Sequence, residues 1–129
     1  MAGEKARKAA KQLQTRADEL MDKAQQKEQK VAELRGEVSE ERRELAREVV
    51  DANKPDDSQT TDALLIAESQ IEISADKGKI SQLETEIVDL KNESNRLANE
   101  SQTLSSLADK AESAEGQAND AAARALSSL

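Results

Sequence analysis

The chain has 129 residues, and none of them is Phe, Tyr, Trp, His or Cys. Without aromatic side chains it lacks the usual filling of a compact globular core, and without Cys or His it has no disulfides, no thiolate metal ligands and no imidazole base. Charged residues make up 36% of the chain and give a net charge of −8, a composition that favours a helical rod over a globule.

Residues 1–53 are predicted to form one long helix with a basic N-terminal tip. Small and aliphatic residues recur every seven positions, and a second set follows three positions after the first, which is the a/d heptad of a coiled coil. The first sixteen residues hold five Lys and Arg against Glu4 alone. The a set is Ala10, Ala17, Ala24, Val31, Val38, Leu45 and Ala52, and the d set is Leu13, Leu20, Lys27, Leu34, Glu41 and Glu48.

A turn is predicted at residues 54–61, because Pro55 cannot continue a helix and Asp56, Asp57 and Ser58 suit the start of the next one. The second heptad arm, residues 62–113, is acidic. Residues 55–129 hold 6 Lys and Arg against 15 Asp and Glu, whereas residues 1–54 hold 13 against 12. Its a set is Ile66, Ile73, Ile80, Ile87, Ser94, Ser101 and Ala108, and its d set is Ser69, Asp76, Leu83, Leu90, Leu97, Leu104 and Ala111.

A reversal near residue 57 predicts an all-α fold, a long antiparallel helical hairpin with coiled-coil packing and a C-terminal helical extension. It sets Leu97 opposite Ala17 and Leu104 opposite Ala10, so large residues meet small ones and the helices can approach closely. Pairing between helices of different chains stays open as an alternative. The predicted hairpin seam consists of Ala10, Leu13, Ala17, Leu20, Ala24, Val31, Leu34, Ile80, Leu83, Ile87, Leu90, Leu97 and Leu104.

Next to the turn the seam pattern is poorer, because Val38 faces Asp76 and Glu41 faces Ile73. The simpler interpretation is a pair of solvated edges, since carboxylates are rarely buried. The alternative is that apolar residues outside the seam pack on another chain at this end. These residues are Val49, Leu64, Leu65 and Ile71.

Residues 114–129 form an Ala-rich extension that runs past the end of the first helix in this register. Its apolar stripe has no partner within the hairpin, so we expect it to dock on another molecule; a short third helix and a frayed terminus are the alternatives. The candidate docking residues are Ala118, Ala121, Ala122, Ala125, Leu126 and Leu129. Gly36, Gly78 and Gly116 are candidate flexible points, since Gly lowers helix stability relative to Ala.

The basic N-terminal tip is expected to lie along the acidic second arm, where complementary charge helps to set pairing and orientation. Contact with nucleic acid or an anionic surface is the other hypothesis. It is not the expected one, because the tip has only five basic residues and the chain carries a net charge of −8.

No catalytic motif, metal-ligand spacing, phosphate loop or apolar span of membrane length is recognisable, so neither an enzyme nor a cofactor is expected. A structural protein that oligomerises as a scaffold, spacer or assembly component is expected, for example in a virion, filament or cytoskeletal particle. The alternative is an adaptor that binds a single protein partner through one helix face or the extension. In the absence of an apolar signal segment, the expected location is intracellular or within an assembled particle.

Overall fold

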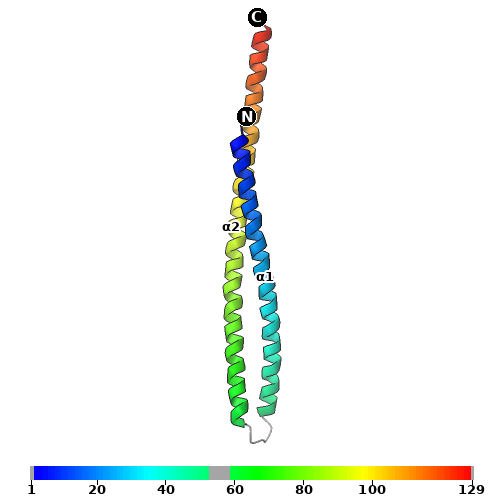
Figure 1. The fold of residues 1–129 in the computed structure, drawn as a ribbon, viewed down its shortest axis with the longest axis vertical. Coiled ribbons are helices and arrows are strands. Elements are labelled where there is room, and N and C mark those ends of the chain that lie inside the picture. Colours follow the sequence, from blue (N-terminus) through cyan, green and yellow to red (C-terminus); the bar gives the residue numbers. More distant parts are fainter. Residues whose placement is uncertain (1, 53–58, 129) are drawn as a thin grey trace. The chain divides into compact units, whose positions relative to one another are not determined.

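The computed structural model describes residues 2–52 and 59–128, and these form two α-helices and no strand. Helix α1 spans Glu4–Ala52 and helix α2 spans Gln59–Ser127. The two helices pack against each other as an all-α helical hairpin, which confirms the predicted fold class. Their side-by-side course is visible in Figure 1. None of the described helices is long and apolar enough to cross a membrane.

The helix bounds follow from local sequence. Glu4 stands in the first turn of α1 and Arg124 in the last turn of α2, where each charge opposes the adjacent end of the helix dipole. Helix α2 begins at Gln59, within the segment predicted as a turn. The predicted turn residues Pro55, Asp56, Asp57 and Ser58 lie outside the described part of the chain.

Gly3 shows why the chain needs a glycine at the start of α1. Its φ is +85°, a left-handed conformation that residues with a Cβ adopt reluctantly. A Cβ at this position would stand 2.8 Å from the Ala108 carbonyl oxygen, so the backbone of α2 occupies the space that a side chain would need. The Gly3 carbonyl accepts the first hydrogen bond of α1, from the amide of Arg7 at 2.9 Å.

The chain divides into two compact units, and each contains part of both helices. Unit 1 comprises residues 1–22 and 90–129. At its centre Ala17, Leu20 and Leu97 form a buried apolar cluster, and partly buried residues pack around it. Those surrounding residues are Leu13, Leu90 and Ala98.

Two serines tie the helices of unit 1 together. The Ser94 hydroxyl donates to the Ala17 carbonyl oxygen and the Ser101 hydroxyl to the Ala10 carbonyl oxygen, both at 2.7 Å. All four residues are buried, and the pairs run in opposite directions along the two helices, so the arms of this unit are antiparallel. Each serine side chain is small enough to fit between the two closely packed helices. Its hydroxyl also makes a hydrogen bond to α1, which offsets the cost of burying a polar group.

Unit 2 comprises residues 23–89 and has a seam of its own. Its most buried residue is Ala24, and aliphatic side chains from both helices complete the seam. Lys27 bridges to Glu86 at 2.7 Å across the helices, and Arg35 pairs with Glu84. The buried aliphatic residues of this unit are Val31, Leu34, Val38, Ile73 and Ile87.

Because Leu97 is only 7% exposed whereas Leu126 is 71% exposed, truncating them should have unequal effects. We expect Leu97→Ala to lower the free energy of unfolding by about 2 kcal/mol, the low end for a leucine in a core, since the seam is only two helices wide. Leu126→Ala is the matched control and should change it by less than about 0.5 kcal/mol. Urea unfolding followed by circular dichroism measures both, and equal losses would contradict this packing.

Cysteines at Ala17 and Leu97 test the pairing in a chain that has no other thiol. Because both residues belong to one cluster of unit 1, we expect the dilute double variant to oxidise to a cross-linked monomer. Electrophoresis under denaturing, non-reducing conditions distinguishes this product from a covalent dimer. A dimer as the main product would mean that the helices pair between chains.

Candidate interaction surfaces

Most of the predicted hairpin seam is withdrawn from solvent. The structure buries eight of its residues, which are Ala10, Ala17, Leu20, Ala24, Val31, Leu34, Ile87 and Leu97. The other five are half-buried, and they are Leu13, Ile80, Leu83, Leu90 and Leu104. No large side chain in the described residues is completely buried, because a seam between two helices stays open along both sides.

The structure corrects the picture of solvated edges next to the turn. Val38, Ile73 and Asp76 are all less than 10% exposed, so these three residues are buried in the seam of unit 2. Glu48 is half-buried and accepts a hydrogen bond from the buried Ser69 hydroxyl at 3.0 Å. Carboxyl groups are therefore part of the packing in unit 2. The heptad pattern missed this because it treats charged d positions as solvent-facing.

Glu41 is the least satisfied of these carboxyl groups. Its Oε2 is buried and has no hydrogen-bond partner among the described residues. One carboxylate oxygen each of Glu37, Glu41 and Asp76 lie within 4.8 Å of one another. Oxygen ligands of this type suit hard cations, but carboxylates commonly lie this close without an ion, and proximity alone does not assign a metal site.

These surroundings raise the pKa of Glu41 to about 7. The main cause is a hydrogen bond with Asp76 that forms when the two carboxyl groups share a proton, and partial burial and the negative charge of Asp76 add to it. Glu72 on α2 and Glu37 on α1 contribute further repulsion. A proton at Glu41 therefore supplies the hydrogen bond that the ionised pair lacks.

The raised pKa of Glu41 makes unit 2 sensitive to pH. Between the ordinary pKa of 4.5 and the folded-state value of about 7, the folded chain binds a proton that the unfolded chain releases. Stability should therefore increase as the pH falls through 7 and stop increasing below about 4.5.

Glu41→Gln removes this titration while keeping the side chain's size. We expect the variant to unfold at a higher temperature than wild type at pH 8 and to show a flatter dependence of Tm on pH. Glu33→Gln, at an exposed position whose carboxylate lies 3.7 Å from Lys30, is the control. The contrary result would be a Tm of Glu41→Gln that falls between pH 5 and 8 by as much as the Tm of wild type and of Glu33→Gln.

The basic tip contacts the acidic arm through one residue in particular. Arg7 donates from Nε and one terminal nitrogen to the two carboxylate oxygens of Glu112, at 2.7 and 2.6 Å, and also pairs with Asp109 at 2.7 Å. These bonds raise the pKa of Arg7 and lower that of Glu112. The Ala2 amide donates to Glu115 Oε2 at 2.9 Å, so contacts between the arms of unit 1 extend to this residue.

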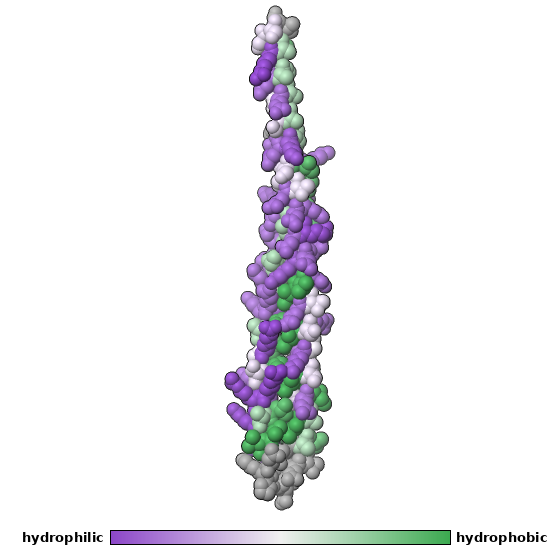
Figure 2. Space-filling model, turned by 180° about the vertical axis from the view of Figure 1, so that it is seen from behind, coloured by the Kyte–Doolittle hydropathy of each residue, from purple (hydrophilic) through white to green (hydrophobic). Residues whose placement is uncertain are grey.

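The C-terminal extension continues α2 without a break as far as Ser127. It does not turn back as a third helix. Five of the six candidate docking residues are exposed, and they are four alanines and Leu126. Figure 2 shows a strip of weakly apolar surface along the C-terminal part of α2. The four alanines are Ala118, Ala121, Ala122 and Ala125, and the sixth predicted residue, Leu129, lies outside the described part of the chain.

Apolar side chains outside the seam are also exposed in unit 2. Ile71 is 69% exposed and Leu64 is 62% exposed, and Val49 and Leu65 are exposed as well. Figure 2 shows apolar surface gathered at the end of unit 2 where α1 finishes and α2 begins. The three candidate flexible points, Gly36, Gly78 and Gly116, all lie within helices, and a Cβ added at any of them would meet nothing within 4 Å.

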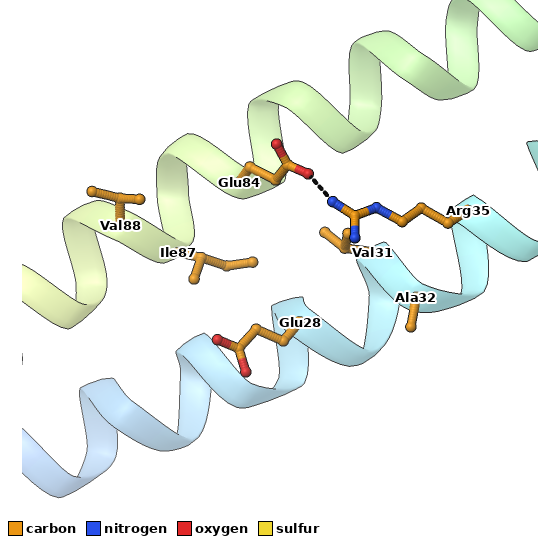
Figure 3. Close-up of a pocket in the computed structure, with 7 residues that line it drawn as sticks. All are labelled: Glu28, Val31, Ala32, Arg35, Glu84, Ile87 and Val88. Carbon is orange, nitrogen blue, oxygen red and sulfur yellow. Dashed lines mark hydrogen bonds and ion pairs between the residues drawn. The ribbon is translucent and has the colours of Figure 1, made fainter.

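An open groove of about 450 Å³ lies between the helices of unit 2. Val31 and Ile87 line its floor, and Arg35 reaches Glu84 beside them (Figure 3). Glu28, Ala32 and the exposed Val88 complete the lining. The groove offers an apolar strip with charged margins and no convergent set of catalytic groups.

Comparison with protein-family models, with curated proteins and with solved structures found no match for this chain.

Proposed function

We propose that this chain is a non-enzymatic coiled-coil protein that oligomerises and serves as a scaffold, spacer or assembly component, inside the cell or in a particle assembled there. A virion, a filament or a cytoskeletal particle would use such a component. The heptad pattern in both arms and the seam of small and aliphatic residues support coiled-coil packing.

The observation that carries the proposal is the uncovered end of α2. The contact between Ala2, just before α1, and this end reaches Glu115, and α2 then runs on to Ser127 with an exposed apolar stripe. A helix of this length depends on packing of its apolar face for most of its stability. A second helix laid on the stripe would supply that packing.

A thin core also favours association. The seam fills with Ala, Ser and medium-sized aliphatic residues, and burial of each large one contributes roughly 1.5–3 kcal/mol against a backbone cost of roughly 1–2 kcal/mol for every ordered residue. Because the backbone cost applies to every ordered residue and few residues are large and buried, binding to a second chain would stabilise the hairpin further.

An adaptor for a single protein partner is the second candidate. The exposed apolar residues of unit 2, especially Ile71 and Leu64, favour it because they lie far along the chain from the extension and outside the seam. A stable small oligomer that binds one partner in a fixed ratio would support this function, whereas assembly that grows with concentration supports the scaffold.

Removing residues 117–129 tests the proposal and leaves the Ala2 contact at Glu115 in place. We expect the truncated chain to keep most of its helicity and to lose a large part of its self-association, because the uncovered stripe is gone. Sedimentation velocity across a concentration series measures the loss.

A surface variant provides the control for the truncation. Ala118→Glu with Ala122→Glu should reproduce the loss, whereas Gln117→Glu with Asn119→Glu adds the same charge beside the stripe and should leave association nearly unchanged. Association that survives both the truncation and the stripe variant would refute the docking role of the extension.

A further inference from the structure

One side of unit 2 carries an excess of negative charge, which we call the acidic edge. It consists of Glu37, Glu40 and Glu44 on α1 and Glu68 and Glu72 on α2, all exposed. Heptad positions g and c place them on the same side of the seam. No ion pair joins any of the five to a described residue. On this stretch of the edge, Arg47 and Lys79 are the basic residues at the same heptad positions.

The acidic edge is unfavourable in the isolated hairpin. Like charges this close repel, and the buried Oε2 of Glu41 stands beside them without a donor. The repulsion that acts on Glu41 comes in part from Glu37 and Glu72, two members of the edge. Cationic side chains brought to the edge by another molecule would reduce the repulsion.

The same chain carries a surface of opposite charge in unit 1, which we call the basic face. Lys5, Lys8 and Lys11 are exposed on α1 and form no ion pair with a described residue. Their neighbours are engaged, because Arg7 is held by Asp109 and Glu112 and Arg16 lies 3.6 Å from Glu19. The basic face is therefore available for an interaction outside the hairpin.

We propose that the partner of the acidic edge is a second copy of this chain, whose basic face binds there. The inference rests on the proposed oligomerisation and specifies how the copies meet. The lengths agree: Lys5 to Lys11 covers about 9 Å along a helix and Glu37 to Glu44 about 10 Å, at 1.5 Å per residue. Charge complementarity of this kind sets register and partner choice, while each exposed pair adds little affinity.

The contact joins two different surfaces. In a two-fold dimer each basic face would meet the acidic edge of the other copy and the assembly would close. With any other relation between the copies, a molecule that binds through its basic face still presents its acidic edge to the next, and growth continues side by side unless the rotation closes a ring. A nucleic acid would engage the basic face alone and would leave the acidic edge unrelieved.

Complementary charge reversal tests this contact. One variant reverses the basic face with Lys5→Glu, Lys8→Glu and Lys11→Glu, and the other reverses the acidic edge with Glu37→Lys, Glu40→Lys and Glu44→Lys. In either variant both surfaces have the same sign, so we expect the association constant of each to fall by about tenfold or more at low ionic strength. An equimolar mixture of the two should associate as wild type does, because each supplies what the other lacks.

Controls separate this contact from general charge effects. Arg43→Glu, Lys77→Glu and Lys110→Glu change the net charge as much as the basic-face variant and should leave association close to wild type. Circular dichroism verifies that every variant is helical, and wild-type association should weaken when the ionic strength is raised from about 0.02 M to about 0.5 M. Sedimentation velocity gives the association constants.

The outcomes distinguish the two proposals. Association of both reversed variants at the wild-type level would overturn this contact and leave the proposed oligomerisation standing. The same would follow if the equimolar mixture of the two variants did not regain wild-type association. It would also follow if a lysine-rich peptide bound to the acidic edge without reducing the self-association of wild type. Wild type that stays monomeric at every concentration and salt level would overturn both proposals.

Discussion

Close approach of the two helices is the constraint on which this structure depends. A hairpin of two helices has no third layer to cover it, so the seam must fill from both sides at short distance. Ala17 beneath Leu97 gives the required space, and Ser94 and Ser101 anchor the approach by donating to carbonyl oxygens of α1. Larger residues at these positions would separate the helices and expose the seam to water.

Heptad periodicity and residue size were enough to predict two helices and their hairpin arrangement. The two serine bonds could not be predicted, because a serine in a heptad counts as a small residue and its donor becomes important only when a carbonyl lies beneath it. Burial of Asp76 was missed for a related reason: carboxylates are usually solvated, and the proton shared with Glu41 depends on an encounter across the two arms. The continuation of α2 through Gly116 could not be predicted from the sequence either, since Gly permits both bending and continuation.

The two units use the same hairpin in different ways. Unit 1 combines a compact apolar cluster with satisfied hydroxyls and a bidentate Arg7–Glu112 pair, and its Lys5, Lys8 and Lys11 form no ion pair with a described residue. Unit 2 places carboxyl groups in and beside its seam. Packing of the seam stabilises this unit, whereas repulsion between the carboxylates destabilises it. One chain thus carries a basic surface on a well-packed unit and an acidic surface on a unit that responds to protonation, which is a suitable division for assembly that depends on solution conditions.

The spacing of the contacts along the chain also bears on how the hairpin forms. Ser69 and Glu48 are 21 residues apart, whereas Arg7 and Glu112 are 105 apart. Closing the shorter loop costs less chain entropy, so pairing begins most easily beside the turn and proceeds towards the termini. The first segments to meet are then those that carry the opposed carboxyl groups. Acidification is therefore expected to speed folding as well as to stabilise the folded state, because it removes repulsion between the carboxyl groups where the two helices first pair.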